Sequence, residues 1–260
     1  MGYLFIRSEK VGKATLITLC APEKRNALDI VMASELDDAL SVCEGDQDTK
    51  VIILTGEGKT FCAGGDVKAM AEAKDPQKFL RELSGSIHKP VFRIWNMEKV
   101  VIAAINGPAV GAGCGLAMAC DLRYASDKAT LNMGYMNVGL APGVGTYFLP
   151  RLVGRAKAGE LIYLSKTISA QEAKDVGLIN DVFENDRFML EVMKAAQAIA
   201  SGPTLAIGRA KTLLRLSEKS LLDEHLKAEQ HMLSISGNSE DFREGVSAFI
   251  EKRKPKFKGK

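Results

Sequence analysis

Two hydrophobic patterns follow one another along the first half of this chain. Continuous apolar runs at Lys50–Thr55 and Val100–Ile105 predict buried strands, each too short to cross a membrane. Tyr3–Val11 and Ala14–Cys20 have the composition of two hairpin strands. After Asp29, which can cap a helix, the apolar positions change to helical spacing. Strands that alternate with helices in this way predict an α/β fold.

A long helix is expected between the two apolar runs, and helices dominate the chain after Gly143. Asp75-Pro76 marks the first turn of a long helix that is expected to end near Met97, and Pro90 is expected to break or kink it. No stretch rich in Pro, Gly or Ser separates two independent domains. The pattern therefore predicts an α/β core over residues 1–200 and a helical C-terminal section over residues 201–260.

Two strand–glycine turn–helix units occur in succession, at residues 50–70 and 100–121. A glycine-rich turn before a helix leaves backbone N–H groups bare, at the end of the helix where partial positive charge collects. Two such N–H groups aimed at one point form an oxyanion hole, which stabilises charge developing on a carbonyl oxygen. The alternative is that these glycines only allow a strand and a helix to pack closely.

Composition and charge narrow the function classes. The net charge of +3 is too balanced to indicate a nucleic-acid partner, and the basic segment Lys252–Lys260 is expected to be a solvated tail. The five cysteines form no C-x-x-C pair, and the three histidines lack the spacing of a zinc site. With no signal sequence and no membrane span, we expect a cytoplasmic protein that binds neither metal, nucleic acid nor membrane.

Several well-known motifs are incomplete. The ending Gly58-Lys59-Thr60 fits a P-loop, but the loop's first glycine is replaced by Ile53. In Gly111–Gly115 the third glycine comes one place too early for a dinucleotide fingerprint. There is neither a G-x-S-x-G elbow nor an H-E-x-x-H sequence. ATP, NAD, serine-hydrolase and zinc-protease chemistry are therefore disfavoured.

The residues of the two turns and of three other segments are more specific. In order and spacing they resemble the enoyl-CoA hydratase/isomerase, or crotonase, family, and the resemblance covers the chain from about residue 5 onward: Arg25–Leu28, Phe61–Asp66, Asn106–Cys114, Cys120–Ala125 and Leu140–Gly143. The resemblance implies a crotonase-like, ClpP-type spiral of β-β-α units with two roughly perpendicular sheets and a helical C-terminal section that builds homotrimers or hexamers. It also implies an acyl-CoA substrate, with coenzyme A as part of that substrate and no separate cofactor.

The same resemblance assigns roles to individual residues. By position, the oxyanion-hole N–H groups fall on Ala63 and Ala112. Two backbone segments would hold coenzyme A, through Lys24, Arg25, Ala27, Leu28, Ala63, Gly64, Gly65 and Asp66. Lys24 and Arg25 are candidate phosphate partners, although loop cations are commonly only solvated. Asp66 also fits the simpler role of a helix N-cap.

This chain departs from the family at the acid/base positions. The two glutamates of family hydratases correspond to Gly115 and Tyr135, and a third acidic position corresponds to Gly143. Tyr135 can donate a proton or orient the acyl group, or it is a packed aromatic wall. His88 resembles the histidine base of the family's aromatic-CoA dehalogenase, or it is a surface or packing residue. Because a general base must reach the proton that it removes, two-glutamate syn hydration is not expected.

Three hypotheses remain open. The first is an acyl-CoA enzyme that stabilises a thioester enolate, as an isomerase, a decarboxylase or a hydratase of an unusual acyl-CoA. Decarboxylation needs the least side-chain chemistry, because the loss of CO2 itself supplies the carbanion. The second is a catalytically silent acyl-CoA-binding protein. The third, RNA binding, rests only on the basic segment Lys252–Lys260.

Overall fold

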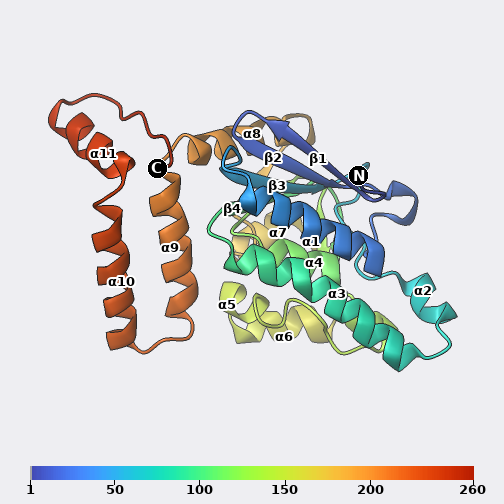
Figure 1. The fold of residues 1–260 in the computed structure, drawn as a ribbon. Helices are drawn as coiled ribbons and strands as arrows, with labels where there is room; N and C mark the ends of the chain where they lie inside the picture. The colour runs from blue at the N-terminus through green and yellow to red at the C-terminus, as the bar shows by residue number, and fades with distance from the viewer. Residues whose placement is uncertain (1) are drawn as a thin grey trace.

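The computed structural model describes residues 2–260, which are built around one six-stranded sheet (Figure 1). The first two strands form the predicted antiparallel hairpin, and each later strand adds in parallel. In sheet order the strands are β1 (Ile6–Val11), β2 (Ala14–Leu19), β3 (Val51–Gly56), β4 (Val100–Ile105), β6 (Leu122–Ser126) and β9 (Asp181–Phe183). Because β3 and β4 are parallel neighbours, the turns that follow them lie at the same edge of the sheet.

Both faces of this sheet are covered, so its central strands are buried throughout. Val51 and Ile53 of β3 face one apolar cluster, which includes residues of α8 (Asn185–Ala200). Ile52 and Leu54 face the other, larger cluster, to which α1, α3 and α4 contribute. This alternation explains why the two runs appear as continuous apolar segments in the sequence.

The helices beside the larger cluster are α1 (Ile30–Gly45), α2 (Val67–Glu72), α3 (Pro76–Asn96) and α4 (Ala112–Ala119). The first three begin where the capping residues predict. Asp29, Asp66 and Asp75 each accept a backbone hydrogen bond as N-caps. The expected break at Pro90 is wrong, because α3 continues through that residue. Ile87, Pro90 and Ile94 are all buried, and this packing offsets the hydrogen bond that a proline removes.

Shorter elements complete the body. A second sheet of three strands contains β5 (Ala109–Val110), β7 (Thr130–Asn132) and β8 (Ile168–Ser169). Two 3-10 helices, η1 (Pro22–Lys24) and η2 (Tyr135–Val138), lie in the loops near the glycine turns. The remaining short helices are α5 (Leu149–Val153), α6 (Arg155–Tyr163) and α7 (Ala170–Asp175). A capping box of Ser169 and Glu172 is present at the start of α7.

Three helices near the C-terminus stand to one side of the sheet (Figure 1). They are α9 (Thr204–Ser217), α10 (Leu222–Ser236) and α11 (Glu240–Ile250). The segment after α11 is not the freely solvated tail that we expected. The buried carboxylate of Asp241 accepts hydrogen bonds from the N–H groups of Lys258 and Gly259, and Arg253 pairs with Glu244. The basic segment therefore folds back on α11.

One buried ion pair fastens α9 to the body. The Nζ atom of Lys211 lies 2.8 Å from the Asp121 carboxylate and donates to the carbonyl oxygens of Ile94 and Lys99. Burial raises the pKa of Asp121 even though Lys211 opposes the rise, so the carboxylate is poorly solvated. Removing either partner would leave the other charge buried without compensation.

We expect Lys211→Met to lower the free energy of unfolding by about 3–5 kcal/mol, because it strands the Asp121 carboxylate inside the protein. Urea denaturation at neutral pH measures the change. Lys219→Met is the matched control, because Lys219 is exposed and forms no ion pair within residues 2–260. Adding Asp121→Asn to Lys211→Met should recover part of the loss, and an additive second loss would contradict this explanation.

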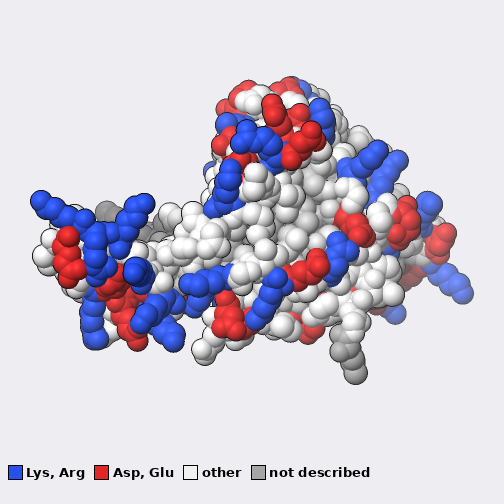
Figure 2. Space-filling view, turned by 90° about the horizontal axis from the view of Figure 1, so that it is seen from above, with Lys and Arg blue, Asp and Glu red and all other residues white. Residues whose placement is uncertain are grey.

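Charges of both signs are mixed over the face shown in Figure 2, without a surface of one sign. Positively charged side chains around the C-terminal helices alternate with acidic ones. Within the described residues, no helix is both long and apolar enough to cross a membrane.

Candidate active site

The two glycine turns after β3 and β4 are fastened to each other through their backbones. Pro108 accepts hydrogen bonds from the N–H groups of Phe61 and Cys62, at 3.1 and 3.2 Å. The Val110 N–H in turn donates to the Cys62 carbonyl at 2.9 Å. The parallel sheet therefore brings together the two segments that the sequence singled out.

Glycine is required for this contact. A Cβ atom at Gly64 would lie 2.8 Å from the Val110 carbonyl oxygen, and the φ of Gly64 is +94°. A Cβ atom at Gly113 would lie 2.4 Å from the Cys62 carbonyl oxygen. Any side chain at these two positions would push the turns apart, so close packing explains part of the glycine pattern.

The N–H group predicted for the first turn is already used. Ala63 donates to the Arg25 carbonyl at 3.0 Å, so the expectation that Ala63 is an oxyanion donor is wrong for this structure. The Gly64 N–H faces the Cys62 sulfur and partly offsets the burial that raises the pKa of that thiol to about 12. The Asp66 N–H donates to the Leu28 carbonyl. Among residues 2–260, the Gly65 N–H of this turn has no acceptor, and the Gly64 N–H has no oxygen acceptor.

On the second turn, the N–H of Ala112 is free, as the sequence predicts. Ala112 is the first residue of α4, and Gly111 before it has no side chain that could cap the helix. The Ala112 N–H has no acceptor among the described residues. Its nitrogen lies 3.5 Å from the point where a Cβ atom of Gly64 would stand, so it faces the first turn. The free N–H groups of Gly65 and Ala112 therefore belong to turns in contact.

The segments predicted to hold coenzyme A are also brought together. Leu28 donates to the Gly64 carbonyl at 2.7 Å, and Ala27 and Leu28 are buried. Lys24 is not free for a phosphate in this structure, because its Nζ atom pairs with Asp29 and lies over the Phe5 ring. Arg25 is exposed and forms no ion pair within residues 2–260. Asp66 caps α2 through the Ala69 N–H, which is the simpler of its two predicted roles.

Gly115, which corresponds to the first glutamate of family hydratases, carries no charge and has no room for a longer side chain. A Cβ atom at Gly115 would lie 2.5 Å from Cγ1 and 2.7 Å from Cβ of Val144, which is buried. Contacts this short do not occur between real side chains, so Val144 occupies the room that a longer residue at Gly115 would need.

Tyr135 lies beside both the second turn and the Val144 loop. Its hydroxyl accepts a hydrogen bond from the Val144 N–H at 3.1 Å. Its Cζ atom is 3.9 Å from the point where a Cβ atom of Gly111 would stand. Burial raises the pKa of Tyr135, and the N–H groups of Val144 and Gly143 oppose the rise. The phenol therefore stays protonated at neutral pH and can donate its proton.

His88 reaches the same loop from α3. Its Nε2 atom lies 2.9 Å from the Gly143 carbonyl oxygen. Since a carbonyl oxygen only accepts, Nε2 must carry a hydrogen, and this nitrogen is not a base in the observed arrangement. His88 is exposed, which agrees with its alternative assignment as a surface residue that positions the loop.

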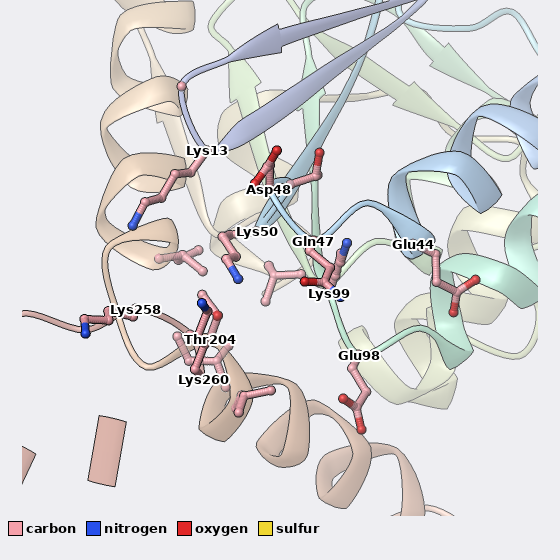
Figure 3. A pocket seen from close by; sticks show the side chains of 18 of the residues that line it. Lys13, Glu44, Gln47, Asp48, Lys50, Glu98, Lys99, Thr204, Lys258 and Lys260 are labelled. Atoms are coloured by element: carbon pink, nitrogen blue, oxygen red, sulfur yellow. The ribbon is translucent and has the colours of Figure 1, made fainter. Parts of the chain in front are cut away.

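A separate cavity of about 940 Å³ lies at the opposite end of the strands, where β2, β3 and β4 begin (Figure 3). Its lining includes Lys13, Lys50, Lys99 and Lys260 but none of the predicted site residues. Lys99 donates to the carbonyl oxygens of Cys43 and Asp46, so part of this charge supports the fold. The site residues predicted from the sequence therefore lie outside this cavity.

Comparison with known proteins gives the same family. The model of the enoyl-CoA hydratase/isomerase family matches residues 9–260. A probable enoyl-CoA hydratase of Rhizobium meliloti is 37% identical, with 99% of each chain covered. The 1,2-epoxyphenylacetyl-CoA isomerase of Escherichia coli is 35% identical, with 98% of this chain and 99% of the relative covered.

Comparison with solved structures gives the same family. An enoyl-CoA hydratase subunit from Geobacillus kaustophilus matches with a TM-score of 0.93 and 34% identity over 99% of each chain. An enoyl-CoA hydratase from Bacillus anthracis also matches with a TM-score of 0.93. The fold, the paired turns and these matches together show that the chain belongs to the enoyl-CoA hydratase/isomerase family and has the crotonase fold.

Proposed function

We propose that this protein decarboxylates a malonyl-type acyl-CoA thioester. The main observation behind this proposal is the set of groups at the site. It contains two free backbone N–H groups and one phenol, and it has no carboxylate at the three usual acid/base positions, Gly115, Tyr135 and Gly143. Such a site can receive the charge of an enolate and protonate it. It lacks the base that hydration or proton abstraction requires.

Gly65 and Ala112 are the proposed oxyanion donors. Both N–H groups are unpaired within residues 2–260 and stand on turns that touch. A pair of such donors stabilises negative charge on the thioester oxygen more strongly in the enolate than in the ground state. Each donor of this kind typically contributes about 3–4 kcal/mol to transition-state stabilisation.

The chemical step balances with the groups present. The bond between the α carbon and the carboxylate breaks, CO2 leaves, and the electron pair moves into the thioester to give an enolate. The α carbon of the enolate then takes the phenolic proton of Tyr135, and the phenolate regains a proton from water. The Tyr135 hydroxyl accepts from the Val144 N–H at 3.1 Å and donates to the Val144 carbonyl oxygen at 3.4 Å. This second bond is long, and in the proposed step the hydroxyl hydrogen turns from that carbonyl to the substrate.

Coenzyme A is the proposed carrier of the acyl group, as part of the substrate and without a separate cofactor. The backbone of residues 24–28 and 63–66, together with the exposed guanidinium of Arg25, is the proposed contact surface. Isomerisation, hydration of an unusual acyl-CoA and silent acyl-CoA binding are the alternatives that the experiments below distinguish.

We also propose assembly into a homotrimer or hexamer through the C-terminal helices. Several large apolar side chains of α9–α11 are more than half exposed in the single chain, namely Leu214, Leu226, Leu233, Phe242, Phe249 and Ile250. Burial of such residues against another copy is the ordinary way to remove them from water.

The first test is turnover. We expect CO2 release from malonyl-CoA or methylmalonyl-CoA, and a loss of about 100-fold or more in kcat for Ala112→Pro, which removes one oxyanion donor. Proline is tolerated at the first residue of a helix, so this variant should fold. Leu222→Pro, at the exposed first residue of α10, is the matched control.

Product analysis over a broader acyl-CoA panel separates the alternatives. A new double-bond position without CO2 release would replace decarboxylation by isomerisation. Addition of water to an enoyl-CoA would replace it by hydration. Tight binding of every thioester without turnover would favour the silent binding protein.

The second test concerns the proton donor. We expect Tyr135→Phe to lower kcat by about 100-fold. Because burial raises the pKa of Tyr135 above its ordinary value of 10.0, kcat of the unmodified enzyme should not fall between pH 7 and about 9 through loss of this proton. Tyr163→Phe is the control, since Tyr163 is exposed on α6. Unchanged kcat in Tyr135→Phe would remove Tyr135 from the mechanism.

The third test concerns the closed glutamate position. We expect Gly115→Glu to lower the free energy of unfolding by about 1–3 kcal/mol through overpacking, and to add no hydratase activity. Gly85→Glu, on α3 with nothing within 4 Å of its Cβ position, should leave stability nearly unchanged. Adding Val144→Gly, which removes both the Cγ1 and the Cβ contact, should relieve part of the loss at Gly115. Equal stability of the two glutamate variants would show that Val144 does not block the site.

A further inference from the structure

Asn26 forms an unusually complete set of buried hydrogen bonds between two loops. Its Oδ1 atom accepts from the Ala21 N–H at 2.9 Å. Its Nδ2 atom donates to the carbonyl oxygens of Thr60 at 2.8 Å and Glu57 at 3.0 Å. The side chain is fully buried, so each of these bonds is costly to lose. Asn26 thus joins the loop before α1 to the segment that leads into the first glycine turn.

The backbone at this point is strained. Arg25 and Asn26 have φ values of 56° and 55°, so two consecutive residues other than glycine adopt the left-handed conformation. Such a conformation costs free energy and persists only where the surroundings hold the residue in place. The hydrogen bonds of the Asn26 side chain keep Arg25 and Asn26 in this left-handed conformation.

This conformation determines which N–H of the first turn is free. It directs the Arg25 carbonyl at Ala63, whose N–H it accepts at 3.0 Å. Leu28 then bonds both sides of Gly65, donating to the Gly64 carbonyl and accepting from the Asp66 N–H. In a bridge of this kind the enclosed residue directs its own N–H away from its partner. The Gly65 N–H therefore points away from the loop that holds it.

We infer that Asn26 is a positioning residue for the oxyanion hole: through the loop of residues 25–28 it sets the direction of the Gly65 N–H. This inference rests on the proposed function, because it assumes that the Gly65 N–H binds the thioester oxygen. Asn26 itself touches no substrate atom in this mechanism.

Asn106 shows that the arrangement is specific to Asn26. Asn106 accepts from the Gly56 N–H and donates to the carbonyl oxygens of Gly56 and Gly58. It therefore fixes the beginning of the same segment, on the side of β4. It makes no hydrogen bond to residues 63–66, whereas the loop of Asn26 makes three.

The test uses the 13C resonance of acetyl-CoA labelled at the thioester carbonyl, which reports polarisation of the carbonyl without requiring turnover. The unmodified protein should move this resonance downfield on binding. Asn26→Gly keeps the left-handed backbone accessible but deletes the side-chain bonds, so we expect it to lose more than half of the shift. For a turned-over substrate it should lower kcat more than it raises KM.

Two further variants separate the effect of the Asn26 hydrogen bonds from the effect of relieving backbone strain. Asn26→Asp retains the acceptor for the Ala21 N–H but removes the Nδ2 donors, and it should also lose more than half of the shift. Lys252→Gly, at an exposed residue with a φ of 54°, controls for relief of backbone strain and should keep the full shift.

The outcomes separate this inference from the proposed function. A full shift in folded Asn26→Gly and Asn26→Asp, with only the melting temperature lowered, would make Asn26 a purely structural residue. If acetyl-CoA binds to the unmodified protein without any shift, the oxyanion hole is wrong and the role of Asn26 is overturned with it.

Discussion

Contact between two bare backbone turns is the constraint on which the rest of this structure depends. At Gly64 and Gly113 a single added carbon would lie within 3 Å of the backbone of the other turn. The parallel pairing of β3 with β4 makes this contact possible, because the turns then leave the sheet at the same edge. With no side chain between them, the N–H groups of the turns become the main polar feature of the site.

Sequence patterns predict the elements around this contact well, because their signals are local. The capping aspartates locate the starts of three helices, and the apolar runs locate β3 and β4 to within a residue. The family resemblance, and not a local signal alone, points to Ala112, and its N–H has no acceptor among residues 2–260. The first turn is different. Whether Ala63 or Gly65 is free depends on the carbonyls of Arg25 and Leu28, far away in the chain.

At the acid/base positions, too, the sequence predicts only part of the arrangement. The sequence reveals that Gly115 carries no carboxylate, but not that Val144 fills the space beside it. The difference matters chemically, because an empty position would admit a water molecule. A position closed by an apolar side chain offers no place for one there. Likewise, only the three-dimensional contact between His88 and the Gly143 carbonyl shows that Nε2 carries a hydrogen.

The site therefore divides its chemistry between backbone and side chains. The proposed oxyanion donors are main-chain groups, so they depend on the contact between the turns and not on a particular side chain. The loop of residues 134–145, which carries Tyr135 and Val144, lies against the second of these turns. Relatives named as hydratases and as an isomerase match this chain at similar identity, and this division explains why overall similarity does not distinguish their reactions. In this chain, a phenol stands at Tyr135, which corresponds to one hydratase glutamate, and Val144 fills the space beside Gly115, which corresponds to the other.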